Sequence, residues 1–116
     1  MKYIIITLLF VVSGIYLCPA QDSKKFQTEE FTVLGVCEMC QKRIEKAALI
    51  SGVVSTKWDK YSQKLEVIFK TKKTSLREIK HAVADAGHDT DDIKATDEAY
   101  QKLPDCCAYR EGVKVH

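Results

Sequence analysis

At 116 residues, the chain has room for one small domain, which excludes a large multi-part enzyme. Its 18 Lys and Arg residues are nearly balanced by 16 Asp and Glu residues, for a formal net charge of +2. The basic residues alternate with acidic ones rather than forming a stripe, so the sequence lacks the electrostatic pattern of a nucleic-acid-binding protein, and no nucleic-acid partner is predicted.

The N-terminal twenty residues differ in composition from the rest. Lys2 is followed by an apolar run from Ile4 to Leu17, and Ala20 offers a small residue at a cleavage position. This pattern is typical of a secretory signal peptide, and the run is shorter than the roughly 20 apolar residues that span a bilayer. We therefore predict cleavage after Ala20 and export to the periplasm. A lipid-anchored protein, modified at Cys18, is the lesser alternative because the residues before that cysteine are bulky.

The first elements of the folded part surround two cysteines. Apolar and polar residues alternate from Phe31 to Leu34 and predict a short strand that reaches Gly35. From Cys40 to Ala48, apolar residues recur at helical spacing, with charged residues between them. This pattern predicts an amphipathic helix that ends near Gly52.

A hairpin and a second helix are predicted next. Two runs rich in β-branched and aromatic residues, over 52–59 and 64–70, predict an antiparallel hairpin. Ser75 and Glu78 form a capping-box signature, so a helix is expected to begin there. Gly87 is expected in the left-handed conformation that often ends a helix.

A weak last strand around Ile93 and Ala95 completes the order strand, helix, strand, strand, helix, strand. This βαββαβ order is that of the ferredoxin-like α+β fold, with two helices on one face of a four-stranded antiparallel sheet. We therefore predict one domain over 28–96, preceded by a leader over 21–27 and followed by a tail over 97–116.

Cys37 and Cys40 lie between the first predicted strand and helix. Two thiols three positions apart at a helix start can converge on one ion, and the N-terminus of a helix favours the thiolate form. Sulfur ligands select soft or borderline ions such as Cu(I), Hg(II) or Zn(II), and they exclude Mg and Ca. The pair could instead carry out thiol-disulfide exchange or form a structural disulfide, the default state of cysteines in an exported protein.

The order of elements, Gly35 before the cysteines and the basic amphipathic helix after them together resemble the heavy-metal-associated domain family. That family includes copper chaperones, N-terminal domains of metal-pumping ATPases and the periplasmic mercury-binding protein. The resemblance extends over roughly Phe31 to Ala95. It implies that Cys37 and Cys40 are thiolate ligands on an exposed loop and pass metal to a partner by ligand exchange. A metal-bridged dimer, in which the cysteine loops of two copies share one ion, is a further possibility.

The loop departs from the usual family pattern, Gly-Met-x-Cys-x-x-Cys. Gly35 lies two rather than three residues before the first cysteine, and Met39 lies inside the pair. Met39 could supply a thioether ligand or be a buried packing residue. His88 is a candidate third ligand, because in this fold the loop after the second helix lies beside the first loop. The alternative for His88 is a solvated loop histidine.

The tail contains a second pair, Cys106 and Cys107. Neighbouring side chains point apart, so these thiols can close on one ion only if a turn, which Pro104 and Asp105 could supply, brings them together. The pair could form a second soft-metal site, lend one sulfur to the first site, or form disulfides that pin the tail. Residues expected to dock the tail by packing are Tyr100, Leu103 and Tyr109.

The leading hypothesis is an exported carrier that binds a soft ion through Cys37 and Cys40 and delivers it to a membrane metal transporter, without enzymatic turnover. The alternatives are a thiol-disulfide redox protein and a disulfide-stapled binding module. Val36 argues against a thioredoxin-type protein, in which an aromatic residue is expected just before the first cysteine. Hydrolytic chemistry has no candidate motif. The acidic run Asp89, Asp91 and Asp92 is expected to be an exposed polar turn.

Overall fold

The computed structural model describes residues 25–116. The predicted signal peptide over 1–20 and most of the predicted leader lie outside the described residues. No helix in the described part is both long and apolar enough to cross a membrane.

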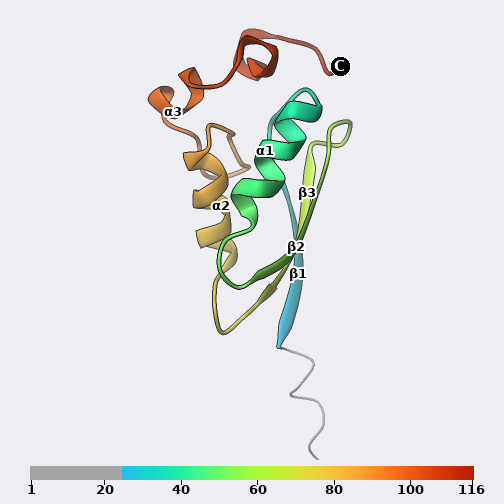
Figure 1. The fold of residues 1–116 in the computed structure, drawn as a ribbon, viewed down its shortest axis with the longest axis vertical. Coiled ribbons are helices and arrows are strands. Elements are labelled where there is room, and N and C mark those ends of the chain that lie inside the picture. Colours follow the sequence, from blue (N-terminus) through green and yellow to red (C-terminus); the bar gives the residue numbers. More distant parts are fainter. Residues whose placement is uncertain (1–24) are drawn as a thin grey trace, which may run out of the picture.

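A three-stranded antiparallel sheet in the order β1-β3-β2 forms one layer of the domain (Figure 1). The strands span Phe26–Thr32 (β1), Val53–Asp59 (β2) and Lys64–Lys70 (β3), so the predicted hairpin is confirmed. Because side chains alternate along a strand, the central strand β3 buries Leu65, Val67 and Phe69 on one face. β1 begins earlier than the strand predicted at Phe31.

Two helices cover the apolar face of the sheet (Figure 1). α1 (Glu38–Ala48) buries Cys40, Ile44 and Ala48, and α2 (Leu76–Asp85) buries Ile79 and Val83. Together with the inward side chains of the strands, these residues form a single core. The predicted pair of helices on one sheet face is therefore confirmed.

The ends of α2 follow the local signals in the sequence. Ser75 is the N-cap, and its side chain accepts a hydrogen bond from the backbone N–H of Glu78. The reciprocal half of the capping box is absent, since the Glu78 carboxylate accepts from the Thr74 hydroxyl at 2.7 Å. Gly87 adopts a positive φ of +106°, as predicted.

The predicted fourth strand around Ile93 and Ala95 does not form in the described residues, which contain three strands and one isolated bridge, between Val33 and Thr90. The reason is a local competition for backbone groups. The Thr90 hydroxyl bonds both the N–H and the carbonyl of Ile93, and Ala95 donates its N–H to the Asp89 carboxylate at 2.8 Å. The ladder bonds that would extend the sheet are therefore replaced by these side-chain bonds and by a turn bond from the Thr90 N–H to the Ile93 carbonyl.

The tail folds back over the N-terminal end of α1 (Figure 1). It contains α3 (Asp97–Gln101) and two short 3-10 turns, η3 (Asp105–Cys107) and η4 (Tyr109–Glu111). Tyr100 is buried, and Leu103 and Tyr109 pack against the core. The prediction that these three residues dock the tail is confirmed.

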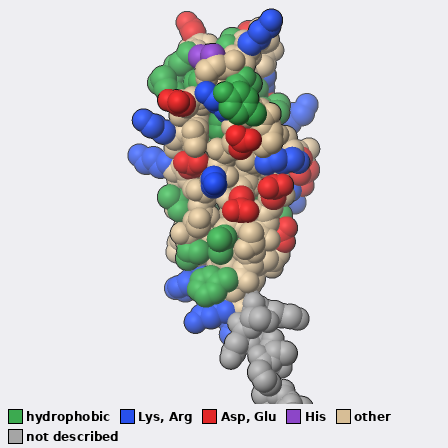
Figure 2. All heavy atoms as spheres, turned by 90° about the vertical axis from the view of Figure 1, so that its right-hand side faces the viewer, with side chains coloured by type: hydrophobic (Ala, Val, Ile, Leu, Met, Phe, Trp, Pro, Cys, Tyr) green, Lys and Arg blue, Asp and Glu red, His purple; other side chains and the backbone are tan. Residues whose placement is uncertain are grey.

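The surface of the domain is mixed in charge. Figure 2 shows acidic and basic side chains interspersed on the face that it presents. Across the sheet, one row of paired positions contains Glu30, Glu66 and Lys57, so both signs of charge occur there as well.

Candidate metal centre

The N-terminal end of α1 supplies two sulfurs. Cys37 is the extended N-cap residue, and its carbonyl accepts the first helical bond, from the N–H of Gln41 at 3.0 Å. Cys40 lies in the first turn and is fully buried. The turn brings the two Sγ atoms to 3.7 Å, so the Cys-x-x-Cys spacing converges as the sequence predicts.

The tail supplies a third sulfur. After Pro104, the η3 turn directs Cys107 into the core, where it is fully buried. Its Sγ lies 3.6 Å from Sγ of Cys37, and the sulfurs of Cys37, Cys40 and Cys107 all lie within 4.8 Å of one another. No disulfide joins the cysteines among residues 25–116. Of the three alternatives for the tail pair, this geometry favours the loan of one sulfur to the first site. We call these residues the three-thiol cluster.

Two of the thiols, Cys37 and Cys107, differ in acidity. Burial alone would raise the pKa of Cys37, but the backbone amide of Cys40 and contacts with the other two thiols outweigh it, so the pKa of Cys37 is lowered. Burial raises the pKa of Cys107 to about 11, although the Arg43 guanidinium lies 3.4 Å from its sulfur and opposes the rise. Cys37 is therefore the first of this pair to lose its proton.

Cys106 does not join the three-thiol cluster. Its side chain is partly exposed, and its Sγ lies 3.6 Å from Sδ of Met39. Met39 is 50% exposed, so its interpretation as a buried packing residue is wrong. The side chains of the two adjacent cysteines therefore lie in different environments, as expected for neighbouring residues whose side chains point apart.

His88 also lies outside the three-thiol cluster. It is fully buried, so the solvated-loop alternative is wrong. Its Nδ1 lies 2.8 Å from the carbonyl oxygen of Leu34, which confirms that the loop after α2 lies beside the first loop. Burial lowers the pKa of His88 to about 4, so the ring is neutral at neutral pH. Its stacking on Tyr109, with ring centroids 5.6 Å apart, gives it a role in docking the tail.

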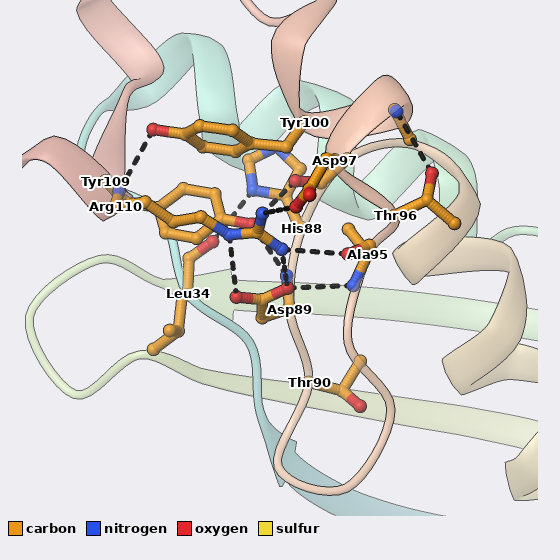
Figure 3. A network of polar contacts seen from close by, with 12 residues as sticks. Leu34, His88, Asp89, Thr90, Ala95, Thr96, Asp97, Tyr100, Tyr109 and Arg110 are labelled. Atoms are coloured by element: carbon orange, nitrogen blue, oxygen red, sulfur yellow. Dashed lines mark hydrogen bonds and ion pairs between the residues drawn. The ribbon is translucent and has the colours of Figure 1, made fainter.

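Arg110 clamps the tail onto the loop after α2 (Figure 3). Its guanidinium donates to both carboxylate oxygens of Asp89, at 2.7 and 3.2 Å, and to the carbonyl of Ala95 at 2.8 Å. It also lies 4.5 Å from the centroid of the Tyr100 ring. Burial alone would raise the pKa of Asp89, but the bonds from Arg110 and the Ala95 amide lower it. The prediction that Asp89 is exposed is wrong.

Tyr109 completes this clamp. Its hydroxyl donates to the carbonyl of Gly87 at 2.6 Å and accepts from the N–H of Asp89 at 2.9 Å. Its ring meets that of Tyr100 edge to face, with centroids 5.1 Å apart. Because Tyr109 and Arg110 closely follow Cys107, these contacts hold the segment that carries the third sulfur against the loop after α2.

A cleft of about 410 Å³ opens beside the three-thiol cluster. Among its lining residues, Cys37 also belongs to the cluster, and His116 comes from the end of the tail. The backbone N–H of His116 donates to the carbonyl of Val36 at 2.8 Å, and its carbonyl accepts from Lys60 at 3.0 Å. The end of the tail therefore contacts both the cysteine loop, at Val36, and the turn between β2 and β3, at Lys60.

Sequence reasoning considered all three cluster cysteines, but it could not select Cys107 over Cys106. It also missed Arg43, Asp89 and Arg110 as residues that support the site. A signal was present for the tail, where "CCAYR" places an aromatic residue and a cation directly after the cysteines. Nothing local in the sequence identifies Asp89 as their partner.

Neither a family model nor a curated protein sequence matches the chain. Solved structures do match. The CopZ metallochaperone is 27% identical over 55% of this chain and 98% of its own, with a TM-score of 0.53. The N-terminal domain of a potential copper-translocating P-type ATPase from Bacillus subtilis, in the Cu(I)-loaded state, is 26% identical over 61% of this chain and 99% of its own, also at 0.53.

Oxidized MerP from Ralstonia metallidurans CH34 is 30% identical over 56% of this chain, with a TM-score of 0.53. The match includes 93% of the MerP chain. This level of identity and near-complete coverage agree with what this chain shows itself, an antiparallel sheet covered by two helices and a cysteine pair at the start of α1. This chain belongs to the heavy-metal-associated domain family.

Proposed function

We propose that this protein is an exported carrier that binds a soft metal ion, Cu(I), Hg(II) or Zn(II), and transfers it to a membrane metal transporter. The observation that carries the proposal is the convergence of the three sulfurs of Cys37, Cys40 and Cys107 within 4.8 Å. Thiolate ligands select soft ions, and three of them provide most of a coordination shell. The names of two matched structures, a metallochaperone and a Cu(I)-loaded ATPase domain, support the same class of cargo.

Ligand exchange follows from the placement of the three sulfurs. Cys37 lines the open cleft and its pKa is lowered, so among the three sulfurs of the cluster it is the one that an incoming ion meets first. Each transfer step forms one metal–sulfur bond to a thiolate of the partner and breaks one to this protein, whose released sulfur takes up a proton. Cys107 belongs to the tail, so movement of the tail would remove one ligand and favour release.

Two parts of this proposal, export of the protein and transfer of the ion to a transporter, rest on observations other than the three-thiol cluster. The signal-peptide pattern over 1–20 supports export to the periplasm. The family includes domains of metal-pumping ATPases, which supports a membrane transporter as the recipient. A metal-bridged dimer is an alternative state of the loaded protein, and the mass of the loaded protein in solution distinguishes it from a monomer.

Titration of the reduced protein with Cu(I), Hg(II) and Zn(II), each against a competing chelator, tests the proposal. Cys37→Ser should abolish tight binding, and Cys107→Ser should weaken it, because each removes one sulfur from the three-thiol cluster. Cys106→Ser is the matched control for the first equivalent of metal, since the neighbouring sulfur lies outside the three-thiol cluster. Binding that persists in Cys37→Ser overturns the proposal. Catalysed reduction of a disulfide substrate, lost in the same variant, would instead support a redox protein.

A further inference from the structure

A second pair of sulfurs lies beside the three-thiol cluster and takes no part in it. Sγ of Cys106 is 3.6 Å from Sδ of Met39, so the tail and the first turn of α1 meet through two soft atoms. Met39 is 50% exposed, so burial of its side chain does not explain its position. Cys106 is only partly buried. Both side chains are therefore accessible to an ion from solution.

The two sulfurs border the same cleft as Cys37. The 410 Å³ cleft is lined by Cys37, Met39 and Cys106, and its other lining residues are Glu38, Lys60 and His116. Cys37 therefore lines the cleft and also contacts Cys107, with 3.6 Å between the two Sγ atoms. The backbone connects the two groups as well, because the Cys106 carbonyl lies 3.8 Å from Sγ of Cys37.

The donor types restrict the ion that such a pair can hold. A thioether has no charge and a polarisable lone pair, so it binds Cu(I) well and contributes little to Zn(II). One thiolate and one thioether also match the charge of a monovalent ion. The pair of Met39 and Cys106 is therefore more selective for a monovalent soft ion than the three-thiol cluster is.

We propose that Met39 and Cys106 form an exposed binding site for a monovalent soft ion, Cu(I), from which the ion moves to Cys37 and the three-thiol cluster. This inference rests on the proposed function, which supplies the class of metal ion that the protein carries. On binding, the Cys106 thiol releases its proton and the thioether donates a lone pair. On transfer, the ion forms a bond to the Cys37 thiolate, its bonds to Met39 and Cys106 break, and the Cys106 sulfur takes up a proton again.

Methionine methyl groups provide a direct probe of this site. The chain contains two methionines, Met1 and Met39, so the reduced full chain labelled with [¹³C-methyl]methionine gives two methyl resonances. Ag(I) serves as a monovalent soft ion that does not change oxidation state during the titration. The Met39 resonance, assigned by its loss in Met39→Leu, should shift as Ag(I) is added, and Zn(II) should leave it unchanged.

Three variants control the experiment. Cys106→Ser should remove the Ag(I)-dependent shift of Met39 while the three-thiol cluster still binds one equivalent. Met39→Leu, at an exposed position, should weaken the second equivalent of Ag(I) at least by the roughly tenfold that loss of a supporting partner costs a metal site. Leu49→Met places a methionine of similar exposure at the other end of α1, and its resonance should not move.

The outcomes separate this inference from the proposed function. A Met39 resonance that stays fixed while one equivalent of Ag(I) binds tightly overturns the second site and leaves the carrier function intact. A shift of Met39 that is retained in Cys106→Ser also overturns the paired site. Failure of the protein to bind even the first equivalent overturns the carrier function.

Discussion

Replacing Arg110 with alanine tests whether the tail clamp positions the third sulfur. The side chain of Arg110 is 25% exposed and that of its partner Asp89 is 10% exposed. Breaking a fully buried pair costs about 3–5 kcal/mol, and an exposed pair contributes about 0–1 kcal/mol. This pair lies between those limits, and the bonds of Arg110 to the Ala95 carbonyl and to the exposed Asp97 carboxylate are lost with it. We therefore expect the free energy of unfolding to fall by about 2–3 kcal/mol.

Urea unfolding followed by tryptophan fluorescence measures this change, since the chain has one tryptophan, Trp58, and it is buried. Exposed Arg77 on α2 provides the matched control, and Arg77→Ala should change stability by less than about 0.5 kcal/mol. A double-mutant cycle with Asp89→Asn should show a coupling energy of about 1 kcal/mol or more between Arg110 and Asp89.

The same variant should affect metal binding. When the clamp is broken, Cys107 is no longer held near Cys37, so affinity for a soft ion should fall toward that of Cys107→Ser. If Arg110→Ala matches Arg77→Ala in stability and binds metal as tightly as the unmodified protein, the clamp does not position the third sulfur.

Two further predictions concern the loop after α2. Gly87→Ala should destabilise the protein by about 2 kcal/mol or more, because a Cβ at this positive φ would lie 2.9 Å from the Ala99 carbonyl oxygen. Gly112→Ala is the control, since Gly112 also has a positive φ but open space around it, and it should cost about 1 kcal/mol. Equal losses of stability in urea unfolding would show that the contact with Ala99 does not matter. The pKa of His88, about 4, lies below its ordinary value of 6.5, so the unfolded chain takes up a proton first as the pH falls. Stability should be complete above about pH 6.5 and decline by up to about 3 kcal/mol by pH 4, with His88→Gln flattening this decline and the exposed His81→Gln leaving it unchanged.

Local signals predicted α1, α2 and the hairpin correctly, whereas the short helix α3 in the tail was not predicted. The N-cap at Ser75 and the positive φ at Gly87 depend on neighbouring residues, so the sequence shows them directly. The first half of β1 carries no such signal, because all of its side chains are exposed and those that follow Phe26 are polar. It is a strand because β3 offers a complete edge, with Phe26 opposite Lys70, and that pairing depends on residues far away in the sequence.

Contacts between distant segments decided the features that the sequence did not reveal. Ile93 and Ala95 have strand-like side chains, but their backbone groups are bonded by the side chains of Thr90, Asp89 and Arg110. The choice of Cys107 over Cys106 likewise depends on the clamp, which places one thiol in the core and leaves the other at the cleft. The cysteine pair at α1 was predictable because its spacing and the helix start are both local.

The contact between Cys37 and Cys107 joins residues 70 positions apart in the chain. An ion bound to both would close a long loop, and cross-links over long loops restrict the unfolded chain most strongly. Loaded protein should therefore keep its tail folded when the clamp opens transiently, whereas protein without an ion exposes the tail to proteases. Susceptibility to cleavage would then report occupancy, and carriers that have delivered their ion would have the shorter lifetime.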